Sequence, residues 1–127
     1  MARYSISSPA DQHYHSAALE NGVQVAAKAL SLVGLYVTND GGGTVWVLVS
    51  DDAGGPHGLA ARTGTIYPCA ALPGDLAISL HGGEEFRNGL YVGAYSTKAL
   101  AILGGAPDAG NVLLIKADYT APKYTPV

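Results

Sequence analysis

The chain has 127 residues, which is enough for one domain of ordinary size and too few for two. Ten acidic residues against seven Lys and Arg give a net charge of −3, which argues against a protein whose main role is to coat nucleic acid. Only 13% of the residues are charged and 48% are apolar, so the composition also argues against a disordered chain. Uncharged side chains must form most of the surface, and such a surface is readily buried against other protein molecules.

The sequence gives no sign of membrane insertion or of a disulfide framework. No window approaches the run of about 18 apolar residues that a membrane span needs, and the first residues lack the apolar stretch of a signal peptide. The lone Cys69 cannot form an internal disulfide. We therefore expect no membrane partner and no secretion, and a Cys69 side chain that packs as a small apolar group.

The N-terminal segment, residues 1–22, is expected to be an arm. A short helix could form within it over residues 9–20, because Ser8 is a suitable helix cap and an Asn-Gly pair follows the segment. The alternative is an extended segment that leads into a strand at Val23–Ala27. No other part of the chain has a helical pattern that we would predict from sequence.

Apolar runs of strand length follow, separated by Gly- and Pro-rich breaks. The clearest is Asp75–Leu80, in which every second residue is apolar, as in a half-buried strand. Four other runs are apolar on both faces: Leu30–Thr38, Thr44–Ser50, Leu90–Thr97 and Val112–Ala117. Because a two-layer core leaves one face of each sheet outside, we expect a neighbouring subunit to cover these strands. The glycines 41–43 are expected to form a hairpin turn.

Short strands separated by turns every 8 to 12 residues predict an all-β protein, specifically a two-sheet β-sandwich of jelly-roll type. The predicted sandwich domain covers residues 23–119. The segment after it, residues 120–127, contains spaced prolines that exclude a helix or a central strand, so we expect a C-terminal arm.

Three clusters of chemistry-bearing residues have simpler explanations than a catalytic or metal site. His13 and His15 would lie on the same side of a strand, but no third metal ligand is evident, so we expect solvated or interface histidines. Asp51-Asp52 lacks the spacing of a calcium-binding loop and is typical of a turn. Neighbouring carboxylates on a strand point to opposite faces, so Glu84-Glu85 is a poor acid/base pair. We expect no metal, no cofactor and no catalytic residue.

The aromatic content has two possible uses. Eight Tyr and one Trp could form a sugar-binding platform or a protein interface, and the low charge favours the interface. Trp46 could instead belong to the core of the sandwich. The residues that we expect to make contacts are Arg3, Tyr4, Tyr14, Trp46, Tyr119 and Tyr124.

The order of segments between residues 23 and 119 is similar to that of a known family. The segment Val33–Asn39 is followed by Val45–Asp51, then by Glu85–Thr97 with its Phe-Arg-Asn-Gly-Leu run, and finally by Asn111–Tyr119. This order resembles the small β-sandwich virion structural proteins of tailed bacteriophages, in which a v-x-l-x-d strand precedes an F-x-x-G-L segment. The chain departs from that pattern in a longer insert around residues 58–69.

The resemblance implies a head decoration or fibre-base protein, and it carries over no catalytic residue and no cofactor. We therefore expect a capsid decoration or cement protein of the virion, not an enzyme. Its expected partners are the major capsid protein and copies of itself, with a homotrimer as a natural unit, and not nucleic acid. The alternative is a tail, baseplate or receptor-binding module that takes a surface glycan.

Overall fold

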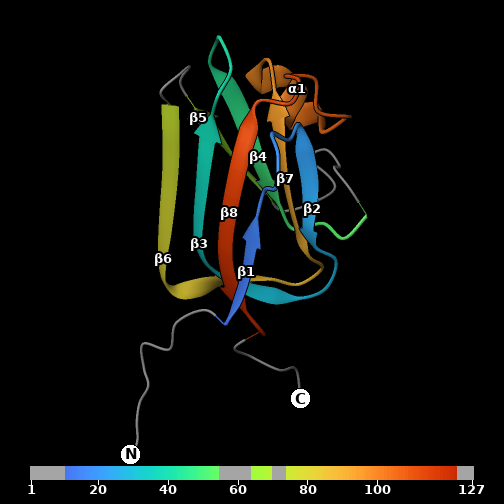
Figure 1. Ribbon diagram of the computed structural model, residues 1–127. Coiled ribbons are helices and arrows are strands. Elements are labelled where there is room, and N and C mark those ends of the chain that lie inside the picture. The colour runs from blue at the N-terminus through green and yellow to red at the C-terminus, as the bar shows by residue number, and fades with distance from the viewer. Residues whose placement is uncertain (1–10, 55–63, 70–73, 123–127) are drawn as a thin grey trace, which may run out of the picture.

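The computed structural model describes residues 11–54, 64–69 and 74–122, and these form two four-stranded sheets and one short helix (Figure 1). The described strands and helix are β1 (Gln12–His15), β2 (Gly22–Ala26), β3 (Leu30–Asn39), β4 (Val45–Ser50), β5 (Gly64–Cys69), β6 (Gly74–Phe86), β7 (Leu90–Tyr95), α1 (Lys98–Leu103) and β8 (Leu113–Thr120). The predicted all-β class is confirmed.

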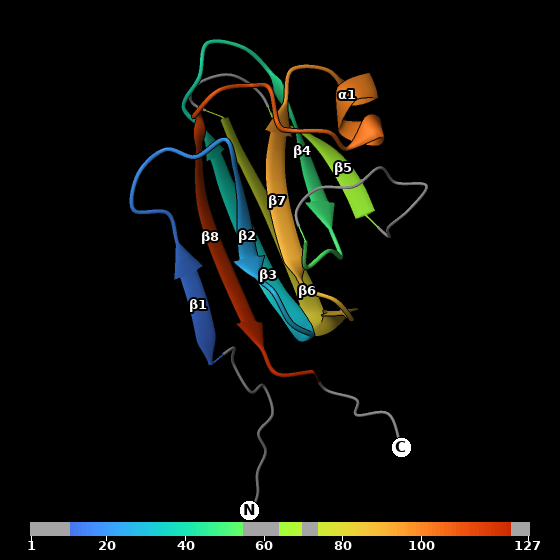
Figure 2. The same ribbon diagram turned by 90° about the vertical axis from the view of Figure 1, so that its right-hand side faces the viewer.

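The two sheets face each other, as the side view in Figure 2 shows. Sheet A has the strand order β1-β8-β3-β6, and sheet B has the order β2-β7-β4-β5. Every pairing between neighbouring strands is antiparallel. Consecutive described strands lie in different sheets, except β4 and β5, which are neighbours in sheet B.

The core lies between the sheets and follows the alternation of side chains along each strand. On β4 the inward residues are Val45, Val47 and Val49, which are at most 5% exposed. Strands β3, β7 and β8 add further aliphatic residues from both sheets to the same cluster. Burial of one such side chain contributes about 1.5–3 kcal/mol to folding, so this cluster supplies most of the driving force.

Part of the outer face of sheet B is covered by the chain's own helix. Leu48 of β4 and Tyr95 of β7 point away from the main core and pack with Ala101 of α1 in a second buried cluster. The Tyr95 hydroxyl donates a hydrogen bond of 2.7 Å to the backbone carbonyl of Gly105. These residues are covered by α1 and not, as we had expected, by a neighbouring subunit.

Helix α1 was not predicted, although its ends carry ordinary signals. Thr97 is the N-cap, and its hydroxyl accepts a hydrogen bond from the backbone N–H of Leu100. Gly104 ends the helix in the left-handed conformation at φ 69°. The six-residue helix comes between β7 and β8 in the chain and lies on the outer side of sheet B, near one end of the molecule (Figure 2).

The helix considered for residues 9–20 is wrong over the described part of that range. Residues Gln12–His15 form β1, which pairs with β8 at the edge of sheet A. The extended alternative is therefore correct there, and β2 follows at Gly22–Ala26 as predicted. The sheets begin before the predicted boundary at residue 23 and continue to Thr120. Both remaining arm segments, 1–10 and 123–127, lie outside the described residues.

The glycine-rich segment after β3 is not a hairpin turn, because β3 belongs to sheet A and β4 to sheet B. The fully buried Asn39 holds this crossing in place. Its side-chain nitrogen donates to the carbonyls of Gly43 at 2.8 Å and Cys69 at 3.1 Å, and its oxygen accepts from the N–H of Gly41. One amide thus links the ends of strands in both sheets.

Cys69 packs in the core as predicted, with 2% of its surface exposed. Its burial raises the pKa of the thiol, which disfavours the reactive thiolate. Strand β6 extends well beyond the predicted Asp75–Leu80 and reaches Phe86. Among the described residues, no helix has the length and apolar character to cross a membrane.

Candidate interaction surfaces

Tyr14 was expected to make contacts with a partner, but its hydroxyl is used within the fold. It donates a hydrogen bond of 2.6 Å to the carboxylate of Glu20. Burial, and then the hydrogen bond to Glu20, raise the pKa of Tyr14 to about 12. The ring packs against the main core. Tyr14 therefore fixes the connection between β1 and β2.

Glu20 gathers several hydrogen bonds at that connection. Its carboxylate also accepts from the hydroxyl of Ser16. Its backbone exchanges two hydrogen bonds with Leu113, at 2.8 and 2.9 Å. The hydroxyl of Ser16 in turn accepts from the backbone N–H of Ile115 at 2.8 Å. The connection between β1 and β2 is thus tied to β8 along its length.

Trp46 lies on the outer face of sheet B and is not part of the main core. It is half-buried beside Leu48 and Tyr95. The ammonium of Lys98, the first residue of α1, lies 6.0 Å from the centre of the Trp46 ring, at the outer limit of a cation–π contact. The alternative that Trp46 belongs to the sandwich core is therefore wrong, and part of its ring is open to a partner.

Of the six predicted contact residues, the structure describes Tyr14, Trp46 and Tyr119, and these three are not brought together on one surface. Tyr119 of β8 packs partly against the core from sheet A. Trp46 belongs to sheet B, so these two aromatic residues lie on different sheets. Arg3, Tyr4 and Tyr124 lie outside the described residues.

The sequence analysis missed a surface that we name the α1 patch, formed by Leu100, Ile102 and Leu103. These side chains are 39%, 45% and 71% exposed. They lie on a helix whose Ala101 is buried against sheet B. Three large apolar side chains on one short helix make a local apolar surface of the kind found at protein contacts.

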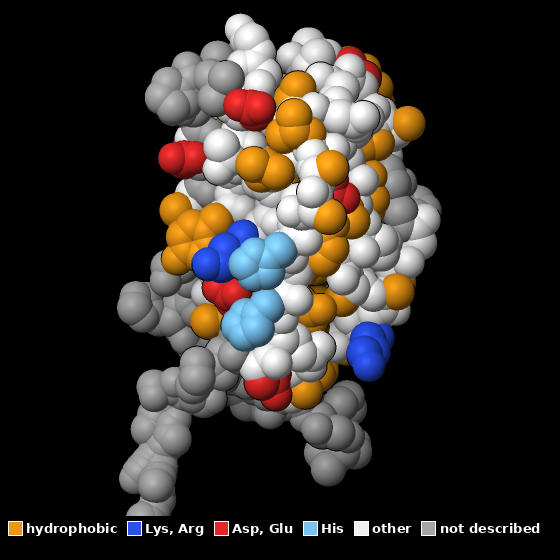
Figure 3. Space-filling view, viewed as in Figure 1, with side chains coloured by type: hydrophobic (Ala, Val, Ile, Leu, Met, Phe, Trp, Pro, Cys, Tyr) orange, Lys and Arg blue, Asp and Glu red, His pale blue; other side chains and the backbone are white. Residues whose placement is uncertain are grey.

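A second missed surface is the sheet A face, formed by His13, His15, Tyr36, Lys116 and Asp118. The strand register places His15, Lys116 and Tyr36 in one row across β1, β8 and β3, with His13 and Asp118 in the next row. The Lys116 ammonium lies 5.7 Å from the centre of the Tyr36 ring. Figure 3 shows the histidines beside a basic and an acidic side chain on this face.

His13 has its own partner on this face. Its Nδ1 atom lies 2.7 Å from a carboxylate oxygen of Asp118, on the paired strand. Over the residues that the structure describes, no group of three or more His, Cys, Asp or Glu side chains is placed to hold a metal ion.

Asp51 and Asp52 organise backbone, as expected for turn residues. The Asp51 carboxylate accepts from the backbone N–H groups of Arg87, Asn88 and Gly89 at 2.7 to 3.3 Å. Asp52 is 1% exposed and accepts from the N–H of Gly54. The backbone of Arg87 and Asn88 is thus held by Asp51 in the turn before Leu90.

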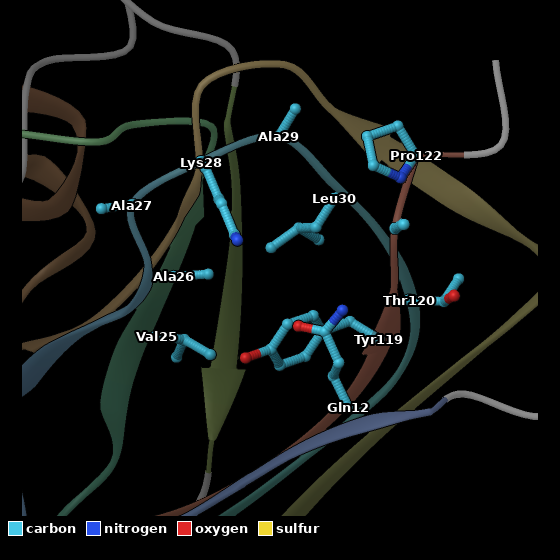
Figure 4. A pocket seen from close by; sticks show the side chains of 11 residues that line it. Gln12, Val25, Ala26, Ala27, Lys28, Ala29, Leu30, Tyr119, Thr120 and Pro122 are labelled. Atoms are coloured by element: carbon cyan, nitrogen blue, oxygen red, sulfur yellow. The ribbon is translucent and has the colours of Figure 1, made fainter. Parts of the chain in front are cut away.

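A pocket of about 510 Å³, which we name the end pocket, opens where β1, β8 and the β2–β3 connection meet (Figure 4). Its walls are mostly apolar, and Leu30 at its side also belongs to the main core. Lys28, Gln12 and Tyr119 contribute polar groups. The described lining residues are Gln12, Val25, Ala26, Ala27, Lys28, Ala29, Leu30, Tyr119, Thr120, Ala121 and Pro122.

Comparison of the chain with known proteins finds no matching family model, no matching curated protein and no matching solved structure. The surfaces above are therefore interpreted from their own chemistry.

Proposed function

We propose that this protein is a structural component of a bacteriophage virion, a decoration or cement protein that binds the outer surface of the capsid. Its partners are the major capsid protein and further copies of this chain, with a homotrimer as the binding unit. It acts through protein–protein contacts that are individually weak and that add up through symmetry.

The strand pairing supports a fold of jelly-roll type within this proposal. Strand β1 pairs with β8, β2 with β7, β3 with β6, and β4 with β5. This is the pairing of a long antiparallel hairpin that has been rolled into two sheets. Eight-stranded jelly rolls occur in viral capsid proteins and in lectins, so the fold is compatible with the role without selecting it.

The observation that carries the proposal is the α1 patch. Leu103 is 71% exposed, and Leu100 and Ile102 are exposed beside it. Exposure of these apolar side chains to water is unfavourable. A partner that covers them therefore stabilises the complex by about 25 cal/mol for each Å² of apolar surface removed from water. Only 13% of the residues are charged, so few charged side chains would have to lose water when the surface is buried against another protein.

A binding experiment on particles tests this role. Particles produced without this chain are incubated with wild-type protein or with Leu103→Glu, and the bound amount is measured after sedimentation. We expect the glutamate to reduce binding at least tenfold, because its charge would have to be buried. The matched control is Leu19→Glu, at a residue 38% exposed in the β1–β2 connection, which should bind normally. Normal binding of Leu103→Glu would contradict the α1 patch as the contact.

The sheet A face favours a second candidate function, a receptor-binding module of the tail or baseplate that takes a surface glycan. Tyr36 is 46% exposed, and it lies in one row with Lys116 and His15, next to the row of His13 and Asp118. Sugar rings stack on aromatic faces while their hydroxyls bond to neighbouring polar groups.

A glycan array separates the two candidates. A receptor-binding module binds a defined set of saccharides and loses that binding in Tyr36→Ala, while the control Leu103→Ala keeps it. A decoration protein binds none of the saccharides and retains its binding to particles when Tyr36 is replaced.

A further inference from the structure

We propose that the end pocket binds a small apolar carboxylic acid, with the hydrocarbon part between the sheets and the carboxylate at Lys28. This site is separate from the α1 patch and from the sheet A face. The argument rests on the shape, the lining and the single charge of the pocket.

The pocket has the size and the wall chemistry of a small-molecule site. Its volume of about 510 Å³ lies within the usual range of ligand pockets, about 300–1,000 Å³. Ala26, Ala27 and Ala29 line one wall, where their small side chains leave the space open. Leu30, which is 2% exposed, and the half-buried Val25 extend the apolar lining toward the core. An apolar chain that enters here loses its contact with water against side chains that the fold already holds in place.

Polar groups converge on the same space from three elements. In Figure 4 the Lys28 nitrogen, the Tyr119 hydroxyl and the Gln12 amide point toward the interior of the pocket. Lys28 comes from the β2–β3 connection, Tyr119 from β8 and Gln12 from β1. All three groups can donate hydrogen bonds, and an acid group with two oxygens can accept more than one of them.

Charge decides the class of ligand. Lys28 is the only charged side chain among the described lining residues, and no described carboxylate lines the pocket to neutralise it. An anionic head group therefore fits better than a neutral or cationic one of the same length. The apolar walls exclude a small hydrophilic anion as the preferred ligand, because such an anion would leave them without a partner.

The probe is octanoate, with octan-1-ol as the neutral analogue of equal chain length. Binding to the full chain is followed by NMR through the backbone amides of Val25, Ala26, Leu30 and Tyr119. We expect saturable shifts at these amides below about 10 mM octanoate, with affinity at least tenfold higher than for octan-1-ol.

Variants separate the role of the charge from that of the cavity. Lys28→Gln should lower the affinity for octanoate about tenfold and leave the affinity for octan-1-ol unchanged. The reason is that Lys28 is exposed, so its replacement removes only the charged partner of the carboxylate. The matched control Lys98→Gln, on α1, should change neither ligand. Ala29→Trp should block both ligands by filling the pocket.

The proposal is overturned if octanoate causes no saturable shift by about 10 mM, or if the shifts lie outside the pocket lining. Equal affinity for octanoate and octan-1-ol in the wild-type protein would also overturn it. These outcomes are independent of the virion role, since that role is measured by binding to particles.

Discussion

The carboxylate of Asp51, at the end of β4, accepts a hydrogen bond of 2.7 Å from the backbone N–H of Asn88, in the turn between β6 and β7. The neighbouring N–H groups of Arg87 and Gly89 point to the same carboxylate. Asp51 ends the Val45–Asp51 segment, and Gly89 belongs to the Phe-Arg-Asn-Gly-Leu run. Two of the four segments on which the family resemblance is based are therefore held together by the Asp51 carboxylate.

Replacement of Asp51 should destabilise this turn. We expect Asp51→Ala to lower the free energy of unfolding by about 1–3 kcal/mol, because hydrogen bonds to a charged acceptor are lost and three backbone donors lose their partner. Urea denaturation monitored by Trp fluorescence measures the change. The control is Asp75→Asn, because the Asp75 carboxylate accepts a hydrogen bond from the Thr38 hydroxyl on an exposed face. This substitution should lower the free energy of unfolding by less than about 1 kcal/mol. Equal losses would contradict the special role of Asp51.

Gly89 should not tolerate a side chain. A Cβ atom there would lie 2.5 Å from the carbonyl oxygen of Ala26 and 2.9 Å from that of Asp52, both of them backbone atoms. We expect Gly89→Ala to lower the free energy of unfolding by about 2–4 kcal/mol. A Cβ atom at Gly42 would have no atom within 4 Å, so Gly42→Ala should change that free energy by less than about 0.5 kcal/mol. The difference between their thermal midpoints checks this, and similar midpoints would refute the close approach at Gly89.

Alkaline stability should depend on Tyr14. Because the fold raises the pKa of Tyr14 from 10.0 to about 12, the folded state favours the protonated phenol. The resulting stability is fully present below pH 10 and is lost as the pH rises from about 10 to about 12. Wild-type protein should therefore lose more stability than Tyr14→Phe over this interval.

Urea unfolding of both proteins at neutral pH and near pH 11 provides the test. Burial also raises the pKa values of Tyr91 and Tyr95, so the wild-type protein and Tyr14→Phe should both lose stability in alkali. Only the difference between the two losses reports on Tyr14. Parallel loss of stability in the two proteins would contradict the raised pKa of Tyr14, which burial and then the hydrogen bond to Glu20 produce.

The C-terminal arm that the sequence predicts, residues 120–127, should contribute to attachment to particles. Deletion of residues 123–127 leaves β8 intact, because that strand ends at Thr120. We expect the truncated protein to fold with unchanged circular dichroism and to occupy particles several-fold less, since contacts in a symmetric array add up. Full occupancy after deletion would argue that attachment does not use this arm.

Part of this fold was accessible from sequence because local apolar patterns specify strands. Strands β2, β3, β4, β7 and β8 lie close to their predicted ranges. The pattern could not predict β1, whose Gln-His-Tyr-His sequence is mostly exposed and which is a strand through its pairing with β8, about a hundred residues away. Nor could it place the crossing after β3, because apolar alternation does not say which strands pair.

The surfaces were harder to predict than the strands. The run Lys98–Leu103 is apolar enough to continue a strand, and only the cap residues Thr97 and Gly104 indicate a helix. The row from His15 to Tyr36 joins residues from three strands, so no spacing in the sequence reveals it. The end pocket likewise depends on β1 and β8 lying side by side. A single local signal was available there, the small residues around Lys28.

The most direct test of the proposed function is the copy number of this chain in purified phage particles, measured by quantitative mass spectrometry against the major capsid protein. A decoration protein predicts hundreds of copies, in icosahedral proportion to the capsid protein. Three to a dozen copies would contradict decoration and favour the tail or baseplate alternative. Absence from particles would remove the virion role altogether.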